Sequence, residues 1–155
     1  MIHTLKFPFL IKPVSSYSGR GILKVNNKSE LKTFLKKNSK KKFSGEYIAE
    51  EFVSGQLYSI SAFVRNSKIA KYFFVKEYCT VFPYQVNSSN LDTKLSSKIK
   101  KNIQVNINLI CEKLSLSDGL LHIQFISDNK SFAFIEAARR CPGEDRKSTR
   151  LNSSH

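Results

Sequence analysis

The spacing of apolar residues predicts a series of short strands in the first half of the chain. Runs rich in β-branched and aromatic residues occupy positions 7–13, 21–25, 46–53, 57–64 and 68–81. The small and flexible residues at 14–21 form a loop between the first two runs, which therefore make a hairpin-like unit. Two more strands are expected at 120–127 and 131–137, joined by a polar turn at 128–130.

Helical spacing is present in two segments. Asn27 and Glu30 have the spacing of a capping box, and a short apolar face follows them, made of Leu31, Phe34 and Leu35. Between 91 and 114, apolar residues recur with helical period along one side of a long helix, at Ile99, Ile103, Ile107, Ile110 and Leu114. Strands, a long helix and strands again predict the α+β class, with antiparallel sheets and flanking helices.

The charge of the chain raises the question of nucleic-acid binding. The 155 residues carry a formal net charge of +14, and clustered cations bind polyanions by releasing counterions. The densest lysine run, at 36–42, falls at a predicted helix end and loop, where the helix dipole and water favour cations. We therefore interpret most of the charge as a solvated surface that disfavours nucleic acid as a partner, and we keep a basic polyanion-binding module as an alternative.

The chain carries no sign of export or membrane insertion. It has no apolar run long enough to cross a bilayer, and its first residues lack the features of a signal peptide. Cys79, Cys111 and Cys141 are widely spaced and form no CxxC pair, which argues against a disulfide framework or a zinc site. We expect a cytoplasmic protein with reduced thiols.

Both ends of the sequence indicate an interrupted chain. The last eleven residues, 145–155, match the in-frame translation of a DNA-sequencing adapter, so we expect a non-native tail there and exclude it from the fold. At the other end, a predicted buried strand begins only six residues after the start. We expect residues 1–144 to be part of a longer domain.

The first group of candidate functional residues follows the first strand. Lys12 ends this strand, and a loop rich in serine and glycine comes next, with Ser15, Ser16, Ser18, Gly19, Arg20 and Gly21. Such a loop can direct backbone N–H groups and hydroxyls at phosphate oxygens, while the lysine adds positive charge. The loop is not a GxxxxGK[ST] motif, so a plain turn is the alternative.

Carboxylates mark the other two groups. Glu50 and Glu51 close an apolar strand before a turn, either as an acid–base pair or as a solvated edge. In the last two strands, period-two alternation places His122 with Gln124 on one face, and Glu136, Ala138 and Arg140 on one face. A carboxylate and an amide oxygen suit Mg²⁺, and an arginine suits phosphate or carboxylate.

In this order, the three groups resemble the ATP-grasp superfamily over residues 7–144. The resemblance implies that Lys12 and the 15–21 loop grip the β- and γ-phosphates of ATP. It implies that Glu136 holds Mg²⁺, with Gln124 at the position of a further metal ligand and Arg140 as the catalytic cation. It implies a hinge whose backbone groups bind the adenine edge, formed by Glu50, Glu51, Phe52 and Val53. It also implies a small lid-like subdomain at about 1–53 and a larger one at 54–144.

Several positions depart from the pattern of the superfamily. The Glu-x-Asn-x-Arg motif aligns with Glu136, Ala138 and Arg140, so alanine replaces the asparagine. Gln124 replaces a metal-binding carboxylate, and Leu57 replaces the acid that often holds ribose. Two short stretches, Leu-Tyr-Ser at 57–59 and Arg-Arg-Cys-Pro-Gly at 139–143, resemble a divergent bacterial branch.

The resemblance implies a ligase that uses ATP and Mg²⁺ to activate a small-molecule carboxylate as an acyl phosphate, which an amine then attacks. We expect this activity of the longer parent protein, and inactivity of the present chain alone. The replacements at Gln124 and Ala138 support an alternative, a domain that binds nucleotide without chemistry. The basic polyanion-binding module is the second alternative.

Overall fold

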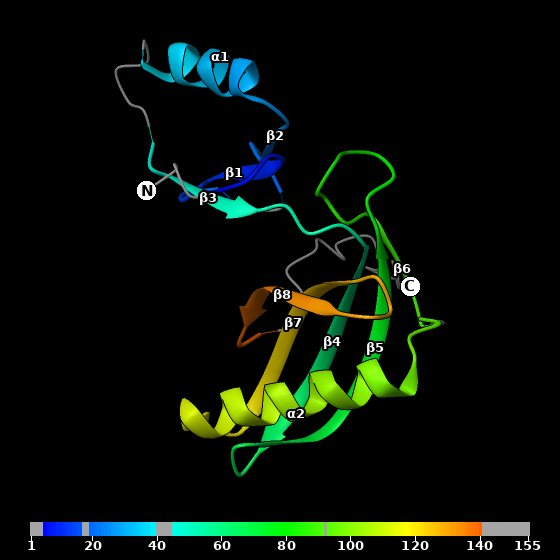
Figure 1. The fold of residues 1–155 in the computed structure, drawn as a ribbon. Helices are drawn as coiled ribbons and strands as arrows, with labels where there is room; N and C mark the ends of the chain where they lie inside the picture. The colour runs from blue at the N-terminus through cyan, green and yellow to red at the C-terminus, as the bar shows by residue number, and fades with distance from the viewer. Residues whose placement is uncertain (1–4, 17–18, 40–44, 92, 141–155) are drawn as a thin grey trace, which may run out of the picture. The chain divides into compact units, whose positions relative to one another are not determined.

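The structure is a computed structural model that describes residues 5–16, 19–39, 45–91 and 93–140 (Figure 1). The chain divides into two compact units. The first comprises residues 1–54 and 81–85, and the second comprises residues 55–80 and 86–155. The expected non-native tail lies outside the described residues.

The first unit is a three-stranded antiparallel sheet with one helix. Its strands are β1 (Phe9–Pro13), β2 (Leu23–Val25) and β3 (Tyr47–Glu51), in the order β2-β1-β3, and its helix is α1 (Lys28–Ser39). The predicted hairpin is confirmed, because Phe9 pairs with Val25. Phe9, Val25 and Ile11 are buried and form a small core with partly buried α1 residues, including Phe34.

The predicted capping box begins α1. The backbone N–H of Glu30 donates to the Asn27 side-chain oxygen at 3.0 Å, and the Glu30 carboxylate accepts from the backbone N–H of Asn26 at 2.9 Å. These bonds satisfy N–H groups that have no partner within the helix. The hydrogen bonds that the Glu30 carboxylate accepts lower its pKa, chiefly the bond from the Asn26 backbone N–H.

The second unit is a five-stranded antiparallel sheet with α2 (Ser97–Lys113) across one face (Figure 1). The strand order is β6-β5-β4-β7-β8. The strands are β4 (Gln56–Arg65), β5 (Lys68–Tyr78), β6 (Ser88–Asn90), β7 (Gly119–Ser127) and β8 (Phe132–Ala138). We call the side of this sheet opposite α2 the open face.

Alternation along the strands separates the core from the open face. Ile60 on β4, Phe74 on β5 and Ile123 on β7 are buried in one cluster with the apolar side of α2. That side consists of Ile99, Ile103, Ile107 and Cys111. Each fully buried aliphatic side chain contributes about 1.5–3 kcal/mol, so this cluster is the main source of stability in the unit.

The ends of the long helix differ from the sequence prediction. Ser96 caps the helix by accepting from the Ile99 N–H at 3.3 Å, so α2 begins at Ser97 and not at 91. Leu114 follows the helix as its C-cap and is 66% exposed, while Cys111 takes the expected place on the buried side. The segment before the helix contributes β6, whose three exposed polar residues carry no apolar alternation to reveal a strand.

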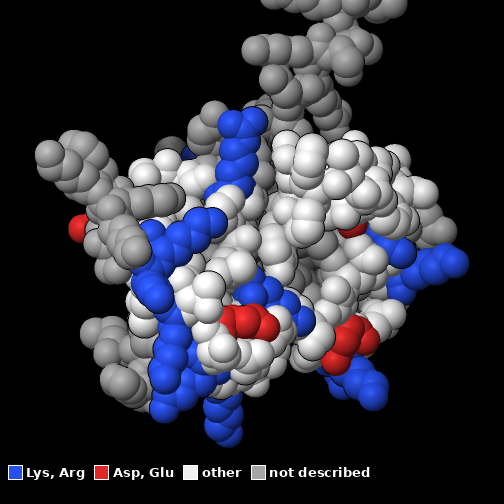
Figure 2. Space-filling view, turned by 90° about the horizontal axis from the view of Figure 1, so that it is seen from above, with Lys and Arg blue, Asp and Glu red and all other residues white. Residues whose placement is uncertain are grey.

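The α+β class with antiparallel sheets and flanking helices is confirmed. Among the described residues, no helix is long and apolar enough to cross a membrane. Most of the described surface in Figure 2 belongs to residues that carry no charge, and lysine and arginine side chains cover more of it than acidic side chains do. On α1, four lysines are exposed: Lys28, Lys32, Lys36 and Lys37.

Candidate functional site

Two lysines and a glutamate lie on the side of the small sheet that α1 does not cover. Phe9 and Ile11 point into the core with α1, so alternation turns Lys12 to the opposite side. The register places Lys24 and Glu50 opposite Leu10, on the same side as Lys12. Lys12 forms an ion pair with the Glu50 carboxylate. This side of the small sheet therefore carries two lysines that could bind an anion. One of them, Lys12, is already paired with Glu50.

The loop after Lys12 depends on glycine for its shape. Gly19 and Gly21 have φ of 69° and 76°, a region that side chains disfavour. A Cβ on Gly19 would also lie 2.2 Å from the carbonyl oxygen of Tyr84. Ser15, Ser16 and Arg20 are exposed, and the Ser16 hydroxyl donates to the Arg20 carbonyl at 2.7 Å. Ser18 lies outside the described residues.

The predicted hinge residues lie at the end of the first unit. Glu50 and Glu51 are the last residues of β3, and Phe52 and Val53 follow without regular structure. The Phe52 ring lies 3.8 Å from the Lys24 ammonium, a cation–π contact. The division between the two compact units falls directly after Ser54.

Strand register in the second unit arranges polar residues in rows across the open face. Gln124 on β7 lies between Ser59 on β4 and Glu136 on β8. In the next row, His122 lies between Ser61 and Ala138. The predicted partners Gln124 and Glu136 are therefore cross-strand neighbours. Arg140 follows the end of β8, and its charge contributes to lowering the pKa of His122.

Glu77 is a residue of this site that the sequence interpretation missed. It lies on β5, is 5% exposed, and accepts a hydrogen bond from Gln124 Nε2 at 2.7 Å. Because the Gln124 nitrogen donates to Glu77, the amide oxygen of Gln124 remains an acceptor or ligand. In the sequence, alternation places Glu77 on the same strand face as Phe73 and Val75, which could have marked it. Its partner Gln124, however, lies 47 residues away along the chain.

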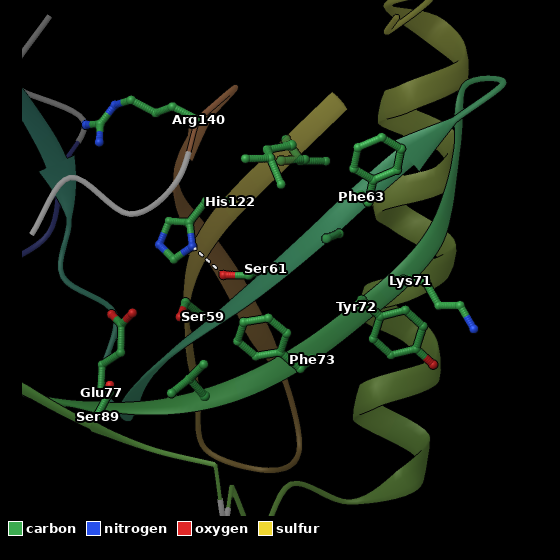
Figure 3. Close-up of a pocket in the computed structure, with 14 residues that line it drawn as sticks. Ser59, Ser61, Phe63, Lys71, Tyr72, Phe73, Glu77, Ser89, His122 and Arg140 are labelled. Carbon is green, nitrogen blue, oxygen red and sulfur yellow. Dashed lines mark hydrogen bonds between the residues drawn. The ribbon is translucent and has the colours of Figure 1, made fainter. Parts of the chain in front are cut away.

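His122 and Ser61 form a partly buried polar pair at the centre of the open face (Figure 3). His122 Nδ1 lies 3.0 Å from the Ser61 hydroxyl oxygen, and the histidine is 8% exposed. Burial lowers the pKa of His122, and although nearby Glu77 and Glu136 act in the opposite direction, the net shift is downward. The imidazole is therefore mainly neutral at pH 7.

The side chains available as ligands limit how the site could hold a metal ion. The described residues contain no group of three or more His, Cys, Asp or Glu side chains that could hold one. Glu136 offers an exposed carboxylate, and Gln124 beside it offers an amide oxygen. Mg²⁺ is commonly held by one or two carboxylates together with phosphate oxygens and water. These residues fit Mg²⁺ that arrives with a nucleotide, but not a cation held by protein ligands alone.

A pocket of about 520 Å³ lies on the open face. Its polar lining includes Ser59, Ser61, His122, Glu77 and Arg140, and its apolar lining includes Phe63, Phe73 and Leu120. Figure 3 shows Ser61 and His122 between Glu77 toward one end and Phe63 toward the other. Of the polar residues that the sequence singled out here, His122 and Arg140 line this pocket with residues of β4 and β5, whereas Gln124 and Glu136 are not among its lining residues.

Comparison with solved structures shows which fold this is. The chain is similar to phosphoribosylglycinamide synthetase from Anaerococcus prevotii, at 18% identity and a TM-score of 0.66, covering 90% of this chain and 34% of that one. It is similar to N5-carboxyaminoimidazole synthetase from Staphylococcus aureus, at 19% identity and a TM-score of 0.69, covering 95% and 38%. It is also similar to the biotin carboxylase domain of Hydrogenobacter thermophilus 2-oxoglutarate carboxylase, at 16% identity and a TM-score of 0.72, covering 92% and 33%.

At these identities the similarity shows the fold alone, and the chain spans between 33% and 38% of the length of these structures. A comparison with curated proteins found no match. The family model for the ATP-grasp domain matches residues 5–147, which is most of the sequence. The chain therefore belongs to the ATP-grasp family.

Proposed function

We propose that the protein is the nucleotide-binding core of a ligase that uses ATP and Mg²⁺ to join a carboxylate to an amine. The proposal is carried by one observation, the pairing of Gln124 with Glu136 on the open face of a chain that matches the ATP-grasp domain. These two oxygen donors have the chemistry that a Mg²⁺-bound nucleotide requires. The whole reaction belongs to a longer protein, of which this chain supplies the core.

In the first unit, Lys12 and the loop would contact the phosphates of ATP. The loop residues with this role are Ser15, Ser16, Ser18, Gly19, Arg20 and Gly21. Lys12 would exchange its Glu50 partner for a phosphate, which costs little because a partly exposed ion pair contributes at most about 1 kcal/mol. The backbone groups of residues 50–53 would bind the adenine edge.

In the second unit, Glu136 and the amide oxygen of Gln124 would hold Mg²⁺. The ion, when bound, neutralises charge on the phosphates. Arg140 would contact the phosphate or the substrate carboxylate, because a guanidinium binds either group through two hydrogen bonds. Glu77 would position Gln124 by accepting from its nitrogen, which leaves the oxygen for the ion.

The reaction has two steps. A carboxylate oxygen attacks the γ-phosphorus and ADP leaves, giving an acyl phosphate. The amine then attacks the acyl carbon, phosphate leaves, and the nitrogen loses a proton. The protein contributes mainly by positioning reactants and neutralising charge, as in phosphoryl transfer generally.

Similar proteins support this choice of ligands by analogy of fold. The Staphylococcus aureus synthetase was solved with ADP, and the Hydrogenobacter thermophilus domain was solved with MgADP and bicarbonate. A D-alanine–D-alanine ligase from Bacillus anthracis was solved with ATP, at 18% identity and a TM-score of 0.60. We extend the nucleotide and a carboxylate substrate to this protein as parts of the proposal.

A nucleotide-binding domain without catalysis is the second candidate. It is favoured by the neutral Gln124 and by Ala138, which lies directly opposite His122 and brings no polar atom to the row. In this case MgATP would bind but no carboxylate would stimulate release of ADP.

The test measures MgATP binding to the chain and ADP release by the longest open reading frame that contains it. We expect Lys12→Ala and Glu136→Ala to remove most of the carboxylate-dependent ADP release while leaving the fold intact. Lys32→Ala on α1 is the control for Lys12→Ala, and Glu112→Ala on α2 is the control for Glu136→Ala. Both control residues are exposed, and each lies on the helix that covers the other face of the same sheet. Retained turnover in both Lys12→Ala and Glu136→Ala would contradict the proposal.

A further inference from the structure

The open face of the larger sheet changes from polar to apolar along the direction of the strands. Glu77 on β5, Gln124 on β7 and Glu136 on β8 lie toward one end of the sheet, and Ser61 with His122 forms the middle row. In the row after it, Phe63 on β4 pairs with Leu120 on β7. A ligand that lies along the strands would therefore meet acidic, then neutral polar, then apolar side chains.

The apolar end of the pocket is formed by large side chains that are about half exposed. Phe63 is 44% exposed, Leu120 is 45% exposed, and Phe73, which pairs with Ser61, is 53% exposed. Phe63 and Leu120 are direct cross-strand partners, and Phe73 lies diagonally from Phe63 on β5. All three line the pocket, and we call them the apolar wall. A contiguous apolar surface beside converging polar groups is typical of a site for a small organic ligand.

Two cations belong to the lining of the same pocket. Lys71 on β5 pairs with Phe63, and Arg140 follows β8, the strand that pairs with β7. Both residues line the pocket. A carboxylate ligand can therefore direct its charge toward a cation while its carbon chain lies on Phe63, Phe73 and Leu120.

We propose that the carboxylate substrate of this protein carries an apolar group, aromatic or branched, that binds on the apolar wall of Phe63, Phe73 and Leu120. This inference rests on the proposed function and specifies its substrate class. The pocket volume of about 520 Å³ suits such an acid, because small-molecule sites commonly measure about 300–1,000 Å³. The partly buried Ser61–His122 pair provides polar atoms beside the wall, and such atoms fix the orientation of a ligand.

A binding experiment on the 155-residue chain tests the proposal. Ligand-observed NMR would compare 3-phenylpropanoate with acetate, which shares the carboxylate and lacks the apolar group. Each buried CH₂ strengthens binding about fourfold, so we expect 3-phenylpropanoate to bind at least about tenfold more tightly than acetate.

Leu120→Ala and Leu109→Ala provide matched variants for the same experiment. Both replace a leucine that is about half exposed, at 45% and 47%, but Leu109 lies on α2 and does not line the pocket. We expect Leu120→Ala to weaken binding of 3-phenylpropanoate on the order of tenfold while acetate is unaffected. Leu109→Ala is expected to leave both affinities unchanged.

Three results would overturn the inference. The first is equal affinity for the two acids, and the second is an equal effect of the two leucine substitutions. The third is a dimer in sedimentation that Leu120→Ala dissociates, since a second copy of the chain would then cover the apolar wall.

Binding of MgATP separates this inference from the proposed function, and it is followed by the melting temperature of the same samples. If MgATP binds and 3-phenylpropanoate does not, the substrate class is wrong and the proposed nucleotide site remains.

Discussion

His122 is a buried residue that binds a proton less tightly in the folded protein than in the unfolded chain. Burial lowers the pKa of His122 below its ordinary value of 6.5, so the unfolded chain binds this proton more tightly than the folded protein does. The contribution of His122 to stability is therefore complete above pH 6.5. It is lost as the pH falls from that value toward the lower pKa of the folded state.

We expect His122→Gln to reduce this pH dependence. The free energy of unfolding, measured in urea between pH 5.5 and 7.5, should fall less steeply toward acid in the variant, because the amide does not titrate. Ser61→Ala is the control, since it removes the hydroxyl partner and keeps the imidazole. Parallel curves for the wild type and His122→Gln would show that His122 does not titrate differently in the folded state.

Gly55 is a position that only glycine satisfies. Its φ is 149°, and a Cβ there would lie 2.7 Å from Ile126 Cγ2 and 2.8 Å from the Ser127 carbonyl oxygen. We expect Gly55→Ala to lower the free energy of unfolding by about 1–3 kcal/mol, through backbone strain and the steric clash. Gly45→Ala is the matched control, because no atom lies within 4 Å of its Cβ position and its φ is not in the strained region. Equal denaturation midpoints for the two variants would disprove this reading of Gly55.

At the scale of elements, α2 stabilises the larger sheet through one side. Ile103 is completely buried, whereas Val105 on the same helix is 50% exposed. Ile103→Ala should lower the free energy of unfolding by about 2–5 kcal/mol, because it removes buried carbon atoms and leaves a cavity. Val105→Ala should change it by less than about 0.5 kcal/mol. Chemical denaturation of both variants measures the difference, and similar losses would mean that α2 packs differently.

The elements were largely predictable because their signals are local. Apolar alternation located β4, β5 and β7, and the capping box of Asn27 and Glu30 located the start of α1. The start of α2 was missed because the apolar periodicity before Ser97 continues without a break, while the Ser96 cap depends on one side chain. β6 was missed because its polar residues form a strand only by pairing with β5.

At the scale of the whole molecule, the net charge of +14 makes non-specific binding to polyanions depend on salt. This dependence distinguishes the nucleotide-binding hypothesis from the polyanion-binding hypothesis. We expect the chain to bind a single-stranded oligonucleotide weakly at 50 mM NaCl and to lose this binding at 200 mM, because exposed lysines act only through counterion release. The rise in melting temperature with MgATP should persist at 200 mM NaCl. Fluorescence anisotropy and thermal unfolding measure the two effects. Oligonucleotide binding that persists at 200 mM would favour the polyanion-binding module.

The sequence alone determined the class of the fold and the family resemblance. Periodicity of apolar residues and capping are set by neighbours along the chain, so they can be read without a structure. The resemblance came from the order of three groups: Lys12 with the serine–glycine loop, the Glu50–Glu51 strand end, and the two last strands with Glu136 and Arg140. The match over residues 5–147 confirms it.

Only the tertiary structure decided which side chains share the open face. Ser61 and His122 are 61 residues apart, and Glu77 and Gln124 are 47 residues apart. Their contacts depend on the registers of β4, β5 and β7, and a shift of one residue would turn each of these side chains to the other face. Register is selected by burial of the whole core against α2, which is a property of the folded chain and not of any short segment.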